Sequence, residues 1–263
     1  MTTRLMRRTI AVGAASLLAV SLFAQGMYTE STTSGGPMGD RTIQSKSYMM
    51  PRMFRHESGD GKVMIVRLDK ELVYWVDPAD KTYSESTFKE IEESMKKAGA
   101  QMDKRMAEME EKMKDMPPEQ RAMMEKMMGG MMGGKSKDAK VEVTGPGEKK
   151  SIGGYNCAKY TVSSDGKEMM TLWVSKDVRG FESLKKDWEE YSRRMAQLTP
   201  GVGKAMAEAF KKLDGYPIQT EMMGVTTVVT KVEKHTTPPS QFEVPAGYTK
   251  TDSPLKKMEK KDE

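Results

Sequence analysis

The chain has 263 residues with 43 basic and 38 acidic side chains, which gives a formal net charge of +5. Residues 1–24 carry three of the arginines and no acid, and without them the charge falls to +2, which argues against a nucleic acid as partner. Cys157 is the only cysteine, so an intramolecular disulfide is excluded.

The first 24 residues have the three parts of a secretory signal peptide. Three arginines precede the small, apolar run Ile10–Val20, and Ala24 is a small residue suited to signal peptidase. The apolar run is shorter than the ~20 residues of a membrane-spanning helix. We therefore expect cleavage after Ala24 and a periplasmic or secreted protein that keeps no transmembrane anchor.

Residues 25–250 are expected to form one β-rich domain, followed by a charged, disordered tail at 251–263. Apolar and polar side chains alternate with the period of a strand in most of the first half. The strands are expected at 41–50, 52–57, 62–68, 71–76 and 81–83, and an edge strand is expected to begin near Met27. Because short turns such as Ser58-Gly59-Asp60-Gly61 separate them, this half should be an antiparallel meander.

A methionine-rich helical insert at 87–132 follows these strands. Thr87 and Glu90 form a T-x-x-E capping box, at which a helix begins. Methionines recur at spacings of three, four and seven residues, so a helix aligns them on one face and leaves the charged residues on the other. Pro117 and Pro118 interrupt the pattern, which predicts a helical hairpin that ends near Gly129.

This methionine stripe has three possible roles. It is expected first to pack the hairpin onto the sheet, because flexible thioethers fill irregular apolar gaps. The same flexibility suits a surface for a hydrophobic ligand or partner. The third role is Cu(I) capture, because thioethers are soft ligands and the M-x-x-M pairs Met106/Met109 and Met113/Met116 offer sulfurs on adjacent turns.

The second half repeats the order of strands and then helices. Strands are expected at 141–149, 155–163 and 168–175, then a second helical insert at 181–213 with an aromatic, apolar face, then strands at 216–223 and 225–234. Thr199-Pro200-Gly201 divides the insert into two helices. Cys157 lies in an alternating strand and is expected to be a buried small hydrophobe.

Several short phrases resemble an exported bacterial family known as domain of unknown function 4412. The phrases are Met64–Arg67, Tyr74–Pro78, Lys81–Tyr83, Ile152–Tyr160, Leu172–Ser175, Gly215–Ile218 and Phe242–Tyr248. The resemblance implies a methionine- and charge-rich helical insert in the middle of the chain, and it carries no catalytic residues. By analogy, the order of elements resembles the half-barrel of bacterial lipoprotein carriers, in which a curved sheet encloses an apolar cavity.

The sequence offers little for an enzyme. His56 and His235 are the only imidazoles, and no nucleophile-elbow, zinc-protease or phosphate-loop motif occurs. His56 lies between Arg55 and Glu57, so we expect it to be an exposed polar residue of a strand. The expected protein is therefore not an enzyme and uses no cofactor.

The predicted fold is α+β: a curved antiparallel β-sheet, or half-barrel, with two inserted amphipathic helical pairs that cover one face. The predicted function is that of an exported envelope protein that binds or shields a hydrophobic ligand or partner, such as a lipid or lipoprotein. Its ligand face is expected to comprise Met95, Met102, Met106, Met109, Met113, Met116, Met123, Met127, Trp188, Tyr191 and Phe210. The alternatives are a periplasmic Cu(I)-binding protein that uses Met106, Met109, Met113 and Met116, and a structural module of the envelope.

Overall fold

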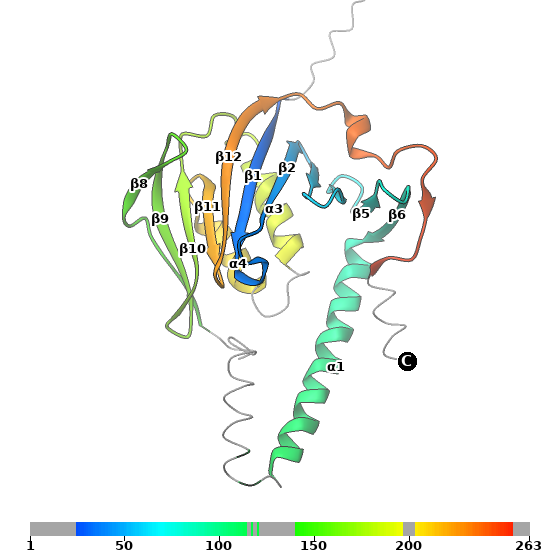
Figure 1. Ribbon diagram of the computed structural model, residues 1–263, viewed down its shortest axis with the longest axis vertical. Helices are drawn as coiled ribbons and strands as arrows, with labels where there is room; N and C mark the ends of the chain where they lie inside the picture. Colours follow the sequence, from blue (N-terminus) through cyan, green and yellow to red (C-terminus); the bar gives the residue numbers. More distant parts are fainter. Residues whose placement is uncertain (1–24, 115–116, 118–119, 121–139, 197–202, 255–263) are drawn as a thin grey trace, which may run out of the picture.

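The computed structural model describes residues 25–114, 117, 120, 140–196 and 203–254, and these form one open, curved sheet with helices on one side (Figure 1). The first six strands are β1 (Gly26–Gly35), β2 (Thr42–Met50), β3 (Met53–Glu57), β4 (Val63–Arg67), β5 (Leu72–Asp77) and β6 (Thr82–Thr87). The later strands are β7 (Val141–Thr144), β8 (Lys149–Ile152), β9 (Tyr155–Ser164), β10 (Lys167–Ser175), β11 (Tyr216–Met222), β12 (Val225–His235) and β13 (Thr249–Lys250). The predicted α+β half-barrel is confirmed.

The strand order is β13-β6-β5-β4-β3-β2-β1-β12-β11-β10-β9-β7, with β8 paired to β9. Strands β2 to β6 pair with their sequence neighbours, as the predicted meander requires. The expectation of an edge strand near Met27 is wrong, because β1 pairs with β2 on one side and with β12 on the other. The β1–β12 pair thus joins the two halves of the chain into a single sheet.

The predicted strand at 141–149 is wrong in its second half: β7 ends at Thr144, and the unpredicted strand β8 begins only at Lys149. Gly145 has φ of 146°, and a Cβ at this position would lie 2.7 Å from the ring of Tyr160. Glycine fits this position, and here the chain leaves the sheet before it returns as β8 on the same side of β9. Both β7 and β8 pair with β9, so they are two short stretches of one interrupted edge.

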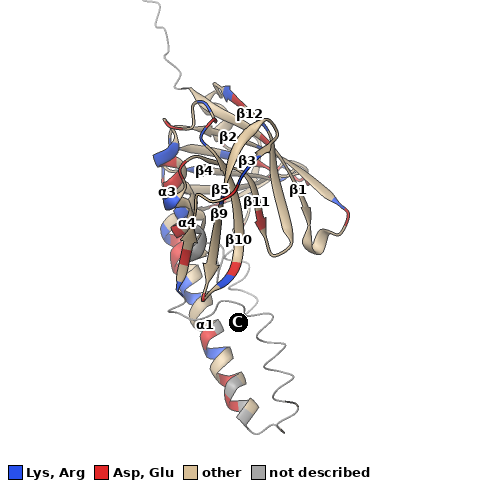
Figure 2. Cartoon of the chain, turned by 90° about the vertical axis from the view of Figure 1, so that its left-hand side faces the viewer, with Lys and Arg blue, Asp and Glu red and all other residues tan. Residues whose placement is uncertain are grey.

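The helices are α1 (Phe88–Lys114), α3 (Lys185–Ala196) and α4 (Gly203–Lys212), and two 3₁₀ helices cover Gly36–Met38 (η1) and Pro239–Phe242 (η2). The predicted capping box is present, because the Thr87 N–H donates to Glu90 Oε2 at 2.7 Å and the Glu90 N–H donates to Thr87 Oγ1 at 3.1 Å. Helix α3 begins at Lys185, after turns at 182–184, four residues later than the predicted insert. Figure 2 marks the positions of acidic and basic residues along the backbone of these helices.

Helices α3 and α4 cover one face of the sheet and build the main core with it. The core joins Phe181, Leu184, Trp188, Ala209 and Leu213 of this region to buried side chains of both halves of the sheet. Burying a large apolar side chain contributes about 1.5–3 kcal/mol, so this second insert supplies a large share of the stability.

Among its described side chains, helix α1 contributes to the main core through those of its first turns. Phe88 and Ile91 are fully buried and Met95 packs at the margin of the main core. Beyond this point α1 runs away from the sheet (Figure 1). Beyond its first turns, the described part of the first predicted insert therefore extends away from the sheet and does not cover it.

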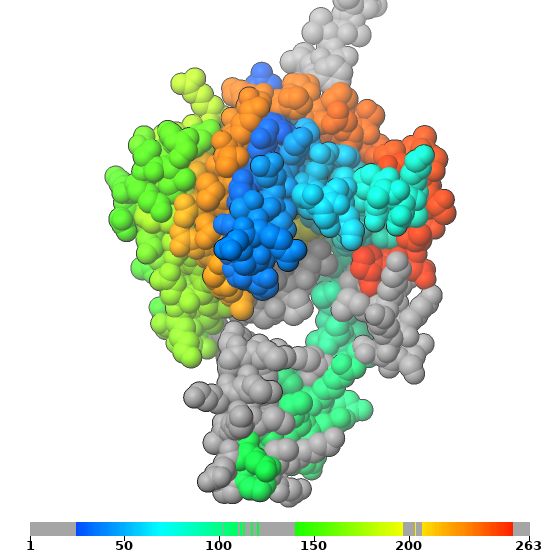
Figure 3. Space-filling model, viewed as in Figure 1, coloured from blue at the N-terminus to red at the C-terminus, as the bar shows by residue number. Residues whose placement is uncertain are grey.

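The outer face of β2 to β6 is covered by the carboxy-terminal segment, residues 239–250. Phe242 is fully buried in a second cluster of side chains, which also contains Met50, Val63, Ile65, Tyr74 and Val76. Strand β13 lies parallel to β6, and the Thr249 N–H donates to Lys81 O at 2.9 Å. Figure 3 shows this segment, in orange to red, beside the cyan strands.

Arg67 ties this segment to the sheet. Its guanidinium is buried, donates to both carboxylate oxygens of Asp69 at 2.8 and 2.6 Å, and pairs with Glu243. These hydrogen bonds hold the pKa of Asp69 below its ordinary value. Since Lys70 also pairs with Glu243, the carboxy-terminal segment is fixed by charge as well as by Phe242.

Candidate functional site

The pairing register of β1 to β5 places a row of apolar side chains on the face that α3 covers. Directly opposite partners point to the same side of a sheet, and they connect Met27, Met49, Phe54, Val66 and Val73 in one line across five strands. All five side chains are buried. We refer to this line as the apolar row.

A second line of side chains runs beside the apolar row. In each strand it is displaced from the apolar row by two residues, or about 7 Å. It contains Thr29, Ser47 and His56, followed by Met64 and Trp75. We refer to Thr29, Ser47 and His56 as the polar row. Because side chains two apart in a strand share a face, the apolar and polar rows face the helices together.

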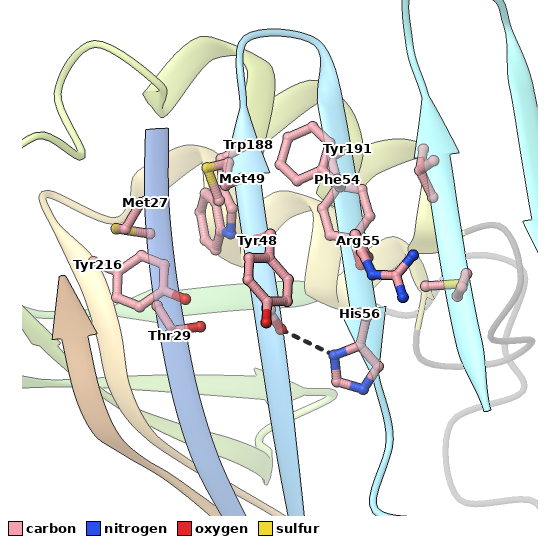
Figure 4. A pocket seen from close by; sticks show the side chains of 13 residues that line it. Met27, Thr29, Tyr48, Met49, Phe54, Arg55, His56, Trp188, Tyr191 and Tyr216 are labelled. Atoms are coloured by element: carbon pink, nitrogen blue, oxygen red, sulfur yellow. Dashed lines mark hydrogen bonds between the residues drawn. The ribbon is translucent and has the colours of Figure 1, made fainter. Parts of the chain in front are cut away.

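A cavity of about 80 Å³ lies between these rows and α3, as Figure 4 shows. Trp188 and Tyr191 of α3 line it from the helix side, and Tyr216 lines it from the start of β11. The ring of Tyr191 stacks on Phe54 with centroids 4.3 Å apart, which fixes the helix over the apolar row. At roughly 15 Å³ for each water-sized sphere, the cavity has room for about five such spheres.

His56 provides the only imidazole in this cavity lining. Its Nδ1 lies 3.0 Å from Ser47 Oγ, and Figure 4 shows this hydrogen bond. Burial lowers the pKa of His56, and the nearby Glu57 carboxylate opposes this shift. The predicted exposure of His56 is wrong: the side chain is half-buried, because it shares the helix-facing side of β3 with Phe54. The alternation from Phe54 could have indicated this orientation.

Two of the three tyrosines that line the cavity, Tyr191 and Tyr216, keep their protons over the physiological range. Burial raises the pKa of Tyr191 to about 12. Burial also raises the pKa of Tyr216, and a hydrogen bond with Thr29 opposes the shift. Tyr216 thus brings a hydroxyl from the second half of the chain to the polar row.

Ser47 and His56 have the residue types of a nucleophile and its base, but their setting does not favour catalysis. Both lie inside strands that are paired on both sides, so their backbone N–H groups belong to the sheet ladder. An oxyanion needs donors that are free to face it. The pair therefore serves best as a hydrogen-bonding patch in the cavity wall.

Ionic contacts hold α3 above the cavity. The Arg52 N–H donates to Asp187 Oδ2 at 2.9 Å, and its Nη1 donates to Glu190 at 3.1 Å. Its Nη2 also donates to Leu68 O at 2.9 Å, so one side chain connects the helix to two turns of the sheet. Arg194 adds a 3.2 Å contact to Glu71. These contacts fix the helix-side wall.

The structure brings together part of the predicted ligand face. Trp188 and Tyr191 line the cavity, and Phe210 of α4 meets Trp188 edge to face at 4.9 Å. The sequence predicted an aromatic, apolar face for this insert, and Trp188 and Tyr191 lie on α3 whereas Phe210 lies on α4. It did not identify Thr29, Ser47 or Tyr216, because small and single polar residues in strands carry no periodic signal of their own.

The methionines of the predicted face lie elsewhere or outside the described residues. Met106 is half-buried, Met109 is 41% exposed and Met113 is buried, all on the part of α1 beyond the sheet. The side chain of Met102 is not among those described, and Met116, Met123 and Met127 lie outside the described residues. Among the residues that the structure does describe, no three His, Cys, Asp or Glu side chains gather to hold a metal ion.

Cys157 is buried, as expected, and it is a free thiol. Burial raises the pKa of its thiol, although Lys150, its partner across β8 and β9, acts in the opposite direction. A raised pKa leaves less thiolate at neutral pH, which fits a packing role.

The predicted signal peptide at 1–24 and residues 255–263 of the predicted tail lie outside the described residues. In the described start of that tail, the Thr251 N–H donates to Tyr83 O at 2.7 Å and Ser253 is buried. None of the helices in the described part combines the length and the apolar character needed to cross a membrane.

One family model matches the chain over residues 105–248, and its description is "Domain of unknown function (DUF4412)". The match begins within α1 and ends at Tyr248 in the carboxy-terminal segment, so it covers all of the second half. No curated protein matches the chain.

Similarity to solved structures is weak. PNGF-II has 10% identity and a TM-score of 0.39, and the match covers 90% of this chain and 32% of PNGF-II. MucB in complex with MucA(peri) has 8% identity, coverage of 86% and 56%, and a TM-score of 0.29. A LolA superfamily protein from Nitrosomonas europaea has 6% identity, coverage of 84% and 91%, and a TM-score of 0.28. The chain thus spans about a third of the length of PNGF-II, and these TM-scores carry no argument about function.

Proposed function

The chain belongs to the family described as "Domain of unknown function (DUF4412)", and we propose that it is a non-enzymatic binding protein that holds a small hydrophobic ligand between its sheet and α3. The ligand lies against the apolar row, with Trp188 and Tyr191 above it. Ligand sites of this kind are concave and mostly apolar, with a few polar groups that fix orientation.

The observation that carries this proposal is the cavity itself. Well-packed cores contain few voids larger than a water molecule. Here a partly open space of about 80 Å³ lies between the sheet and α3, with buried apolar side chains and the rings of Trp188 and Tyr191 in its wall. An apolar guest would regain the contacts that its walls otherwise lack. The proposal does not require the methionines of α1.

The site of action that we propose is the cell envelope or the medium, because the first 24 residues have the pattern of a signal peptide. Amino-terminal sequencing of protein secreted by a bacterial host should begin at Gln25. Recovery of the uncleaved chain from the cytoplasm alone would contradict export. It would not contradict the proposed ligand site.

Fluorobenzene is a suitable probe of the cavity, because it is small, apolar and visible by fluorine NMR. We expect it to bind the wild-type protein saturably. Ser47→Phe places a ring in the cavity from the middle of β2, and it should weaken binding by at least about tenfold, since an occupied site cannot also admit the probe. The titration measures the dissociation constant of each variant.

Lys46→Phe is the matched control, because Lys46 is exposed and adjacent residues of a strand point to opposite faces. It should leave the affinity for fluorobenzene unchanged. Circular dichroism and urea unfolding establish that both variants are folded. Equal affinity of folded Ser47→Phe and wild type would mean that the probe binds elsewhere, and absence of saturable binding to the wild type would refute the proposed function.

A further inference from the structure

One side of the cavity wall is apolar and the other carries hydrogen-bonding groups. These two sides are the apolar row and the polar row. On one side lie the buried Met27, Met49 and Phe54 of the apolar row. On the other side lie the hydroxyls of Thr29 and Ser47 and the imidazole of His56, with the hydroxyl of Tyr216 bonded to Thr29. A purely apolar ligand would cover these polar groups without hydrogen bonding to them, which carries a cost in free energy.

The charges around the cavity are already paired. Arg55 is the one residue of fixed charge among the described residues that line it. Its Nε donates to Glu57 at 2.8 Å and its Nη1 donates to Gln241 O at 3.0 Å, so the guanidinium is engaged with the carboxy-terminal segment on the outer face. At the helix-side rim, Arg52 is held by Asp187 and Glu190. Among the described residues that line the cavity, no unpaired cation is therefore available to form an ion pair with an anionic ligand.

His56 also favours a neutral partner. Burial lowers its pKa, so the ring is uncharged above neutral pH and presents one donor and one acceptor nitrogen. Serine and threonine hydroxyls likewise donate and accept. The polar row can therefore satisfy a hydroxyl, ester or amide group, whereas a buried carboxylate or phosphate would lack a counter-charge.

We propose that the ligand is an amphiphile in which an uncharged hydrogen-bonding group, such as an ester, amide or hydroxyl, is joined to an apolar chain. The uncharged group contacts Ser47 and His56, and the chain lies on the apolar row. This inference rests on the proposed function and adds to it the class of ligand. Because the cavity is small, it takes the polar group with a short length of chain.

Two ligands of matched chain length test the inference at pH 8: methyl hexanoate, which is neutral, and hexanoate, which is charged. Each competes with fluorobenzene for wild-type protein. We expect methyl hexanoate to displace the probe at least about tenfold more effectively, since hexanoate must bury an unpaired carboxylate. Affinity for hexanoate equal to or higher than that for the ester would overturn the inference. Saturable binding of fluorobenzene would in that case still support the proposed function.

The double variant Ser47→Ala, His56→Leu tests whether the polar row causes the preference. It should bind methyl hexanoate about tenfold more weakly than wild type does and bind fluorobenzene at least as well, because only the ester uses these hydrogen bonds. His235→Leu is the control, since His235 is exposed and does not line the cavity. Unchanged ester affinity in the folded double variant would show that the polar row does not bind the ligand.

Discussion

Replacing Phe242 by alanine is expected to lower the free energy of unfolding by about 3–5 kcal/mol, the range found for truncation of a fully buried aromatic side chain. Phe242 is completely inaccessible and lies among Met50, Ile65 and Tyr74 on the outer face of the sheet. Removal of its ring leaves a void between the carboxy-terminal segment and β4. Urea unfolding monitored by circular dichroism measures the change.

Gln241→Ala is the matched control, because Gln241 precedes Phe242 and its side chain is exposed. Arg55 bonds to its backbone oxygen, which the substitution retains. We expect a change within about 0.5 kcal/mol. A loss of less than about 1 kcal/mol in Phe242→Ala would mean that the carboxy-terminal segment is not part of the cooperative unit.

Trp188→Ala is expected to cost a similar amount, about 3–5 kcal/mol, and to enlarge the cavity. Its indole ring packs edge to face with Phe181 at 5.5 Å and with Phe210 at 4.9 Å. If the cavity is the ligand site, fluorobenzene at ten times its dissociation constant should restore about 1.4 kcal/mol, because a ligand stabilises only the state that binds it. Thermal unfolding with and without fluorobenzene measures this recovery.

Trp75→Ala is the control for this recovery. Trp75 lies on the same face of the sheet, two strands from His56, and is half-buried without lining the cavity. Fluorobenzene should stabilise this variant no more than it stabilises wild type. Trp188→Phe provides a milder change if the alanine variant does not fold. If one fixed concentration of fluorobenzene stabilised the Trp75 and Trp188 variants equally, this would contradict the assignment of Trp188 to the wall of the probe site.

The sequence alone was sufficient to predict secondary structure where a pattern of residue types repeats along the chain. The meander from β2 to β6 followed from alternation and short turns, and the start of α1 followed from Thr87 and Glu90. The aromatic face of α3 followed from the spacing of Trp188 and Tyr191. The predicted burial of Cys157 is also confirmed.

The sequence did not show which distant segments of the chain pair with each other. Met27 gave the signal of a strand, but only its pairing with both Met49 and Lys234 shows that β1 lies inside the sheet. The carboxy-terminal segment is a similar case. Phe242 is a single buried ring in an irregular segment, so no periodic pattern in the sequence indicates its burial.

The sequence by itself determined where most strands and helices lie, though not β8 or β13, since spacing of apolar residues and capping chemistry act between near neighbours. Only the tertiary structure decided which side of each strand meets α3, and hence that His56 and Ser47 share a cavity wall with Phe54. The physical reason is register: a shift of one residue would move every side chain of a strand to the other face. Contacts across the whole sheet, not the composition of one strand, set that register.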